Sequence, residues 1–337
     1  MPAEWEPHQA TWITWPRPES DSFPGEHYEP AARTLGRLVA EIARGEEVHL
    51  NCWDEAAAEE AHGFARAAGA RMDRVYTHVF PAYEPWCRDH GPIFVVHDGP
   101  PRRRAVLDWG YNAWGGKYPP WDLDDAIPQR IAAFRGLPVW SPGLILEGGS
   151  IDGDGRGTLL TTESCLLNPN RNRGLGREAI ERALRSWLGV ERICWLGEGI
   201  VGDDTDGHVD DITRFVAPGV VATAVEPDPA DPNHAPLAEN LARLRAWRDE
   251  RGRPFRIVEI PMPGPVAQEG VRLPASYLNF YIANAAVIVP VYGHPNDRIA
   301  LAALREVVRD RPVVGLDARD LIWGLGAFHC MTQQEPV

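Results

Sequence analysis

The chain has 337 residues, of which 44% are hydrophobic, and a formal net charge of −14. Such a chain can bury one large core or two modest ones, and its acidity argues against a nucleic-acid partner. No apolar run approaches the roughly 18 residues that a membrane-spanning helix needs, so no membrane association is expected. Five cysteines without a C-x-x-C pair argue against a disulfide framework or a structural zinc site, and they favour a reducing compartment. With no secretory signal pattern at the N-terminus, we expect a cytoplasmic protein.

Strand-like and helix-like patterns alternate along the chain. Helices are predicted where apolar residues recur every three or four positions, at 31–44, 176–188, 237–247 and 297–308. Strands are predicted for β-rich runs next to polar or glycine-rich clusters, at 93–96, 158–162, 220–223 and 285–290. This alternation predicts an α/β fold, and the absence of a Ser/Gly-rich linker predicts a single domain over residues 1–337.

Four polar residues in these clusters are spaced at nearly regular intervals. Asp89, Glu147, His208 and Cys330 follow one another after 58, 61 and 122 residues, and 122 is twice 61. A period near 60 suggests repeated units around an axis, with each unit bringing a strand end to a common pocket. Chance spacing of four chosen residues is the alternative. His208 and Asp210 lie two positions apart, so we expect them to share one face of a strand.

Cys330 lies in a glycine-rich turn near the C-terminus, where the backbone can approach a ligand closely. A thiol, a histidine and several carboxylates together fit the hydrolysis of a guanidine through a covalent intermediate. Asp89 and Asp210 would bind the guanidinium, whose N–H groups match carboxylates, and its charge would favour the Cys330 thiolate. His208 would protonate departing ammonia and then deprotonate water, while Glu147 would orient the imidazole.

Other interpretations of the same residues are weaker. A zinc hydrolase is disfavoured because zinc sites draw on closely spaced ligand pairs, and only His208 and Asp210 are close. We therefore expect neither a metal nor a cofactor. Trp86 lies three residues before Asp89 and is the tryptophan best placed to pack against a substrate chain.

The chain resembles the agmatine deiminase family, which is related to bacterial-type peptidylarginine deiminases among the guanidine-modifying enzymes. The matching segments run nearly from end to end: Pro2–His8, Arg88–Asp89 with Gly91–Pro92, Asn112–Tyr118, Leu146–Gly149, Leu159–Glu163, Leu166–Asn172, Thr205–Asp210, Ala275–Asn284, and His329–Cys330 with Thr332–Gln334. The resemblance implies a five-bladed α/β-propeller of ββαβ units with the active site on the central axis.

The resemblance also implies the residue roles and the reaction. Cys330 would be the nucleophile, His208 the general acid/base, Asp89 and Asp210 the guanidinium-binding carboxylates, and Glu147 a further catalytic carboxylate. Agmatine and water would give N-carbamoylputrescine and ammonia through an S-linked amidino intermediate, without metal or cofactor. The expected binding partner of this chain is its small cationic guanidino substrate. The sequence does not decide whether the chain also forms a homodimer.

This chain departs from the family pattern around the inferred site, at His90, Ser150, Leu325, Ala327 and Phe328. These changes leave the reacting groups in place, so we interpret them as bearing on the substrate. Three alternatives to agmatine hydrolysis follow. The same chemistry could act on another guanidino compound, such as a specialised metabolite or peptidyl-arginine. The amidino group could be transferred to an amine instead of water. The protein could also bind a guanidine without turning it over.

Overall fold

The structure is a computed structural model that describes residues 1–248 and 251–337. Its small sheets follow one strand order, in which an antiparallel pair is extended by a parallel third strand. Five sheets of this kind occur among the described residues, and along the chain they are β18-β1-β2-β3, β4-β5-β6, β7-β8-β9, β10-β11-β12 and β15-β16-β17. The first sheet joins the two ends of the chain and carries a further parallel strand, and β13 and β14 form a separate hairpin.

The strands have the following bounds: β1 His8–Thr14, β2 Glu47–Cys52, β3 Val75–Val79, β4 Ile93–His97, β5 Arg103–Leu107, β6 Val139–Trp140, β7 Ile151–Gly153, β8 Thr158–Thr162, β9 Arg192–Leu196, β10 Thr213–Ala217, β11 Val220–Val225, β12 Arg256–Pro261, β13 Ala267–Gln268, β14 Val271–Arg272, β15 Tyr281–Ile282, β16 Val287–Val291, β17 Val313–Asp317 and β18 Thr332–Pro336. The helices are α1 Tyr28–Ile42, α2 Glu55–Ala67, α3 Cys87–His90, α4 Ala113–Gly116, α5 Asp122–Asp125, α6 Ile127–Arg135, α7 Glu163–Leu166, α8 Arg177–Leu188, α9 His234–Ala246, α10 Asn296–Val307 and α11 Phe328–Met331. Short 3₁₀ turns include η3 Gly148–Ser150, η4 Val209–Asp211 and η5 Ile322–Gly324.

The predicted helices are confirmed as α1, α8, α9 and α10, and the predicted strands as β4, β8, β11 and β16, with ends shifted by a few residues. In α1 the periodic apolar residues Leu35, Leu38, Val39 and Ile42 are all buried, as the sequence pattern requires. Helix α8 ends at Gly189, whose φ of 69° is the left-handed conformation that glycine adopts without strain. The α/β fold predicted from the sequence is therefore confirmed.

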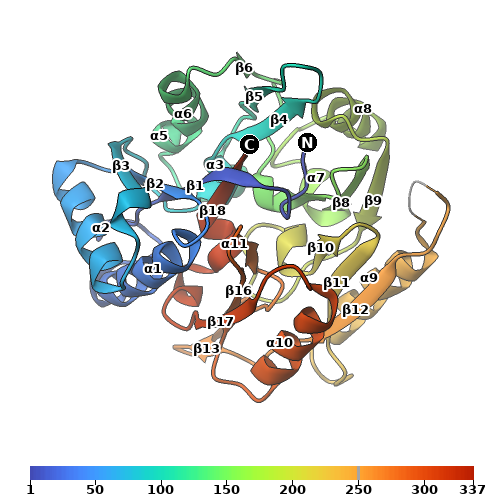
Figure 1. Ribbon diagram of the computed structural model, residues 1–337. Helices are drawn as coiled ribbons and strands as arrows, with labels where there is room; N and C mark the ends of the chain where they lie inside the picture. The colour runs from blue at the N-terminus through green and yellow to red at the C-terminus, as the bar shows by residue number, and fades with distance from the viewer. Residues whose placement is uncertain (249–250) are drawn as a thin grey trace.

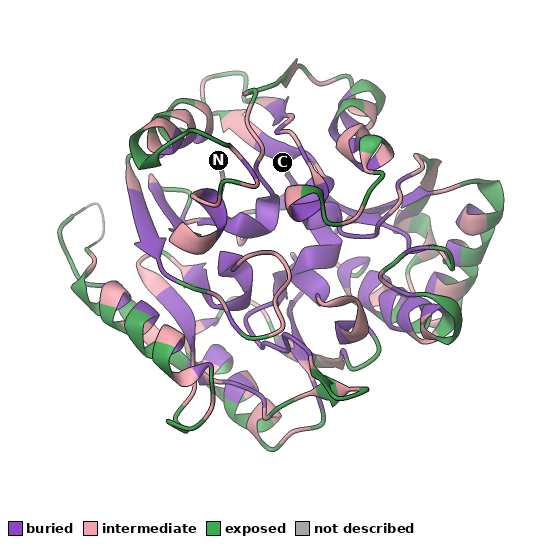
Figure 2. Cartoon of the chain, turned by 180° about the vertical axis from the view of Figure 1, so that it is seen from behind, coloured by how far each residue is buried: buried purple, intermediate pink, exposed green. Residues whose placement is uncertain are grey.

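Each parallel pair is connected through a helix, so that helices cover the outside of the molecule. Figure 1 shows α1, α2, α6, α8, α9 and α10 at the periphery, and both chain ends near the middle of the view. Figure 2 shows the buried residues gathered in the strands and the central turns, and the exposed residues on the outer helices. Among the described residues, no helix combines the length and the apolar character needed to cross a bilayer. This arrangement places the short turns α3, η3, η4 and α11 in the interior, where they contact one another.

Candidate active site

Three of the predicted site residues meet at Gly149, in the turn η3. A Cβ atom at this position would lie 2.6 Å from His208 Nδ1, 2.8 Å from Asp89 Oδ1 and 3.1 Å from Asp210 Oδ2. The Gly149 amide also donates a hydrogen bond of 3.0 Å to Asp89 Oδ1. Only glycine leaves room for three charged groups to approach the backbone here, so η3 is the floor on which the site is assembled.

Cys330 lies in α11 and is 5% exposed. Asn279 fixes the turn around it: the Asn279 Oδ1 atom accepts hydrogen bonds from the amides of Ala327, His329 and Cys330, at 3.2, 3.1 and 3.2 Å. Asn279 Nδ2 lies 2.9 Å from Cys330 Sγ, and Asp210 Oδ2 lies 3.6 Å from the same sulfur. Burial, together with the charge of Asp210, raises the pKa of the Cys330 thiol well above its usual value. Without a bound ligand, the Cys330 side chain is therefore a thiol rather than a thiolate.

His208 is fully buried between two carboxylates. Its Nδ1 atom lies 3.6 Å from Asp89 Oδ1, and its Nε2 atom lies 4.0 Å from Glu147 Oε2. Burial by itself would lower the pKa of His208, but the charge of Asp89 and the neighbouring Cys165 and Glu147 outweigh it and hold that pKa well above its usual value. Both ring nitrogens, Glu147 Oε2 and Asp210 Oδ1 lack a hydrogen-bond partner among the described residues. Buried polar atoms without partners mark the place where a polar ligand fits.

Asp89 binds its surroundings through both oxygens. Besides the Gly149 amide, it accepts a hydrogen bond of 3.0 Å from Trp114 Nε1. Burial raises the pKa of Asp89 to about 6; the charges of Asp210 and Glu147 add to this rise and His208 opposes it. A cation placed beside Asp89 would reverse the shift, because an opposite charge favours the ionised carboxylate.

A chain of buried charges extends from Asp210 to the N-terminal segment. His329 places its Nδ1 atom 2.7 Å from Asp210 Oδ2 and its Nε2 atom 2.9 Å from Glu4 Oε2. Arg214 and Arg88 also reach Glu4 Oε2, with Nη2 atoms at 2.9 and 3.3 Å. Burial alone would raise the pKa of Glu4, but Arg214, His329 and Arg88 together hold it well below its usual value. Asp210 therefore has its position set by a network that spans the whole chain.

The expectation that His208 and Asp210 share a face of a strand is wrong. Asp210 lies in the 3₁₀ turn η4, and His208 immediately precedes that turn with extended backbone. The His208 amide is held by Asp203 Oδ2 and Thr205 Oγ1, at 3.2 and 3.1 Å, after a turn in which Gly207 has a φ of 97°. These contacts fold the segment before a strand can begin, and both side chains still reach Gly149.

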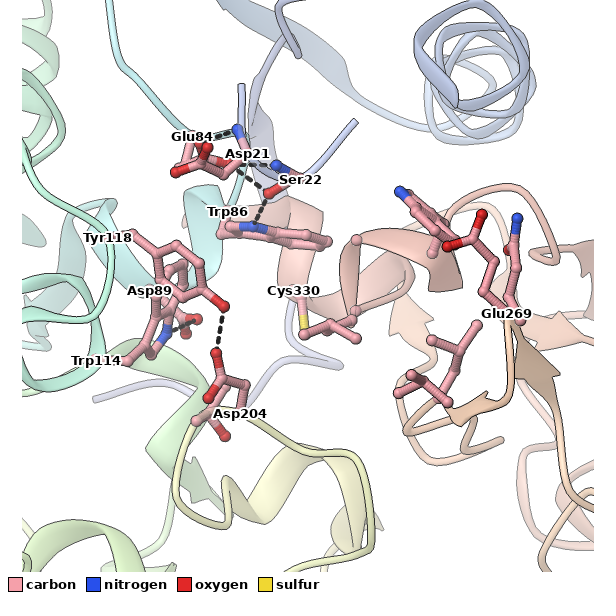
Figure 3. A pocket seen from close by; sticks show the side chains of 18 residues that line it. Asp21, Ser22, Glu84, Trp86, Asp89, Trp114, Tyr118, Asp204, Glu269 and Cys330 are labelled. Carbon is pink, nitrogen blue, oxygen red and sulfur yellow. Dashed lines mark hydrogen bonds between the residues drawn. The ribbon is translucent and has the colours of Figure 1, made fainter. Parts of the chain in front are cut away.

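The cavity above this floor has a volume of about 270 Å³. Asp89, Trp86 and Cys330 line it, and in Figure 3 the Cys330 sulfur points into its centre. Four further carboxylates line its walls and mouth: Asp21, Glu84, Asp204 and Glu269. No basic side chain occurs among the described residues of this lining. Such a cavity attracts cations and repels anions.

The structure brings all five predicted catalytic residues together. His208, Asp210 and Glu147 are fully buried. His208 lies 3.6 Å from Asp89 and 4.0 Å from Glu147, and Cys330 lies 3.6 Å from Asp210. Asp210 is close to Asp89 and His208 because all three approach Gly149. Glu147 is also bound through Oε1 to Arg171 Nε at 2.7 Å. The residues that sequence reasoning missed are those that hold the reacting groups in place: Glu4, Trp114, Arg171, Asn279 and His329. Their only signal was that each lies in or beside a segment that matched the family pattern.

Of the five departures from the family pattern, Leu325 alone appears in the cavity lining, among the described residues. Ser150 is buried and donates a hydrogen bond of 2.6 Å to the Glu147 carbonyl oxygen, and His90 is buried with Nε2 3.2 Å from the Glu84 carbonyl oxygen. Ala327 and Phe328 are fully buried in the turn of the nucleophile. Any direct effect of these departures on the substrate therefore passes through Leu325.

One group of potential metal ligands occurs among the described residues: Glu147, Cys165 and His208, whose ligand atoms lie within 4.8 Å of one another. Two of these residues belong to the catalytic set. The Arg171 guanidinium already lies against Glu147, and this positive charge opposes the binding of a metal cation at the same carboxylate.

Comparison with known proteins assigns the chain to a family. The sequence pattern of the Porphyromonas-type peptidyl-arginine deiminases matches residues 1–336. The chain belongs to this family. It is similar to the agmatine deiminase of Stutzerimonas stutzeri, with 40% identity over all of this chain and 95% of that protein. The resemblance to agmatine deiminases, seen in the sequence, is therefore confirmed.

Solved members of the family have the same fold. An agmatine deiminase of Enterococcus faecalis superposes with a TM-score of 0.89 at 33% identity, covering 100% of this chain and 95% of that one. A C. jejuni agmatine deiminase with substrate bound superposes with a TM-score of 0.90 at 30% identity, covering 99% and 95%. These matches extend over the whole length of this chain, including both of its ends in the central sheet.

Proposed function

We propose that this protein hydrolyses agmatine to N-carbamoylputrescine and ammonia through a covalent intermediate on Cys330. The observation that carries the proposal is the convergence of an imidazole and two carboxylates at Gly149, with Glu147 beside His208 and the Cys330 thiol beside Asp210, next to a cavity lined by acids. A guanidinium brings positive charge to the carboxylates of this cavity, which no basic side chain of the described lining offsets. The similarity to agmatine deiminases supports the same reaction.

Binding comes first. Asp89 and Asp210 accept the guanidinium N–H groups, and the central carbon of the guanidinium then faces Cys330. The raised pKa values of Asp89 and Cys330 give this step a further consequence. The incoming cation lowers both values, so Cys330 releases its proton to solvent and forms the thiolate only when the substrate is present.

Chemistry then proceeds in two halves. The Cys330 thiolate forms a C–S bond to the guanidino carbon, and the imidazolium of His208 gives its proton to the departing nitrogen as the C–N bond breaks and ammonia leaves. The neutral His208 next takes a proton from water, whose oxygen attacks the S-linked amidino carbon. As the C–S bond breaks, the hydroxyl proton of the adduct passes to the departing sulfur, so that the ureido product is released and the Cys330 thiol is restored. Glu147 and Asp89 stabilise the positive charge that His208 carries before the first step and regains in the second.

The walls of the cavity favour agmatine over free arginine. Agmatine ends in a primary ammonium alone, whereas arginine carries a carboxylate on the same carbon as its ammonium, so that its far end has no net charge. The exposed Glu269 and the half-buried Asp204 lie in the cavity lining, away from the Cys330 floor in Figure 3. These carboxylates attract an amine and repel a carboxylate, so the charge at the far end of the substrate decides between the two.

Several properties expected from the sequence belong to the same proposal. The five sheets with one recurring strand order would be the blades of a five-bladed α/β-propeller, with the site on its axis and residues 1–337 forming a single domain. We expect catalysis without a metal or organic cofactor, in the cytoplasm. Sedimentation of the purified protein would decide whether it forms a homodimer.

The test is product formation from a panel of guanidines: agmatine, arginine, a peptidyl-arginine, and shorter and longer guanidinoalkylamines, with Cys330→Ala as the control. Ammonia and a ureido product are expected from agmatine far above the rest, with none from Cys330→Ala. Acid quenching during turnover should trap an amidino adduct on Cys330, detectable by mass spectrometry. Adding a primary amine as acceptor separates hydrolysis from amidino transfer. Agmatine that binds but is never turned over would show a non-catalytic binder and refute the proposal.

A further inference from the structure

Unusual backbone conformations cluster around the cavity. In the part of the chain that the structure describes, the non-glycine residues with positive φ are Ala113, Trp114, Asp206, Glu269 and Leu325. Trp114, Glu269 and Leu325 line the cavity. Ala113 directly precedes the lining residue Trp114, and Asp206 directly follows the lining residue Thr205. Positive φ strains residues that carry a Cβ atom, and such strain collects at functional sites.

Two of these residues, Trp114 and Asp206, form side-chain hydrogen bonds in the strained conformation. Trp114 donates its indole hydrogen bond to Asp89 at 3.0 Å, and Asp206 accepts hydrogen bonds from Asn170 at 2.9 Å and Lys117 at 3.1 Å. Leu325 has a φ of 74° and a side chain that cannot form a hydrogen bond. The strained backbone at Leu325 is therefore not explained by a polar contact of its side chain.

The turn itself explains the φ angle but not the side chain. Its neighbours press against Trp86: a Cβ atom at Gly324 would lie 2.9 Å from Trp86 Cζ2, and one at Gly326 would lie 2.6 Å from Trp86 Cζ3. The Leu325 amide closes the turn with a hydrogen bond of 3.0 Å to the Ile322 carbonyl oxygen. Glycine at position 325 would make the same turn without strain. The leucine side chain must therefore contribute something that the turn does not need.

Part of that contribution is packing against the main cluster of buried apolar residues, and part of it lies in the cavity. The Leu325 side chain is half-buried and lines the cavity together with Trp86, Val271, Leu273 and Trp323, which form its apolar part. Cys330 follows five residues later in the same C-terminal segment. A substrate with its guanidinium on Asp89 and its far cation near the outer carboxylates must lay its methylene chain between them.

We propose that Leu325 is a specificity-determining residue, whose side chain packs against the methylene chain of a linear guanidinoalkylamine and narrows the cavity against branched or bulkier chains. This inference rests on the proposed function and assigns a substrate contact within it. Burial of the Leu325 side chain against the substrate increases the affinity for that substrate. The backbone strain at position 325 lowers the free energy of unfolding of the substrate-free protein. Leu325 therefore lowers the stability of the folded protein and raises its selectivity among substrates.

Two substitutions separate the side chain from the strain. Leu325→Gly removes both, so kcat/KM for the preferred substrate should fall about tenfold, mainly through KM, while Tm rises by roughly 2 °C. Leu325→Ala removes most of the side chain but keeps a Cβ atom at positive φ, so it should show the same loss of kcat/KM without the rise in Tm. Both should flatten the preference among straight chains of different length and among chains branched beside the guanidine. Leu316→Ala, in a half-buried leucine of β17, is the matched control and should leave the preference unchanged.

Binding is measured separately in the Cys330→Ala background by calorimetry, with agmatine and its shorter, longer and branched analogues as the probes. Guanidinoalkylamines that bind Cys330→Ala and Cys330→Ala/Leu325→Gly equally well, with the same length preference, would overturn the assignment of Leu325 and leave the proposed function intact. Absence of binding to every guanidine would overturn both. A fall in Tm for Leu325→Gly would show that the side chain is held by core packing, which would refute the exchange of stability for selectivity.

Discussion

The prediction that tests most of the structure at once is Glu4→Gln. This substitution keeps the shape of the side chain and removes one negative charge from a site where Arg88, Arg214 and His329 meet. All three of these side chains are buried, so none can turn to water for compensation. Breaking a buried ion pair by removing one partner costs about 3–5 kcal/mol. At roughly 2 °C per kcal/mol for a chain of this length, a loss of about 4 kcal/mol lowers Tm by roughly 8 °C.

The pH dependence of stability gives the same prediction a second readout. The pKa of Glu4 in the folded protein is held well below its ordinary value of 4.5. The stability that this carboxylate contributes is therefore complete above pH 4.5 and is lost as the pH falls toward the folded-state value. Glu4→Gln should lose that part of the acid sensitivity, so its unfolding free energy should approach that of the parent protein in acid.

The assay is urea unfolding followed by circular dichroism from pH 8 down to about pH 3, which covers the range below 4.5 where the contribution of Glu4 is lost. The kcat/KM of each variant is measured at neutral pH. Glu29→Gln is the control, because Glu29 and its partner Arg33 are 62% and 63% exposed and such a pair contributes less than about 1 kcal/mol. Activity should also fall in Glu4→Gln, since His329 loses the carboxylate that fixes its far nitrogen and Asp210 is held less firmly. If Glu4→Gln lowers the free energy of unfolding by less than about 1 kcal/mol at pH 7, then Glu4 does not offset the buried charge of its partners, and the prediction is refuted.

Two further predictions concern the reacting groups. Because the pKa of Asp89 is raised to about 6 in the free enzyme, Asp89 is protonated at lower pH and cannot bind a guanidinium, so kcat/KM should fall about tenfold per pH unit below 6; a pH–rate profile that stays level down to pH 5 would contradict this. Asn279→Ala removes the acceptor of three amides and the donor to Cys330 Sγ. It should lower kcat about a hundredfold while the circular dichroism spectrum is kept, and a kcat within twofold of the parent would show that the turn of the nucleophile holds itself.

The sequence predicted the elements whose formation depends on local pattern. Helix α8 has its apolar residues on one face and ends at a glycine, and strand β8 is a fully buried β-rich run. The reacting residues were also within reach, because cysteine, histidine and aspartate in glycine-rich turns are chemically conspicuous. Their convergence was predicted from the family resemblance and from the regular spacing. The structure shows it as the approach of Asp89, His208 and Asp210 to Gly149 and as the contact of Cys330 with Asp210.

The supporting residues could not be predicted in the same way. Glu4 and His329 are 325 positions apart, and their contact exists because β1 and β18 pair in one sheet. No local pattern marks a glutamate near the N-terminus as the counter-ion of buried arginines. The conformation of 208–210 was mispredicted for a related reason. A two-residue alternation is compatible with a strand, but the hydrogen bonds that the His208 amide donates to Asp203 and Thr205 select a turn.

The charges of the site give a physical reason for its dependence on the substrate. The pKa of Cys330 is raised because burial and the carboxylates disfavour a thiolate, and the pKa of His208 is raised because the same kind of carboxylates favour an imidazolium. Both groups therefore hold a proton at rest. In the proposed mechanism, this leaves His208 ready to act as the general acid and Cys330 inactive as a nucleophile. Only a bound cation changes the balance at Cys330, since it cancels the negative charge that opposes ionisation of the thiol. A neutral molecule of the same shape would enter the cavity without activating the sulfur, so selection for positive charge takes place in the chemical step as well as in binding.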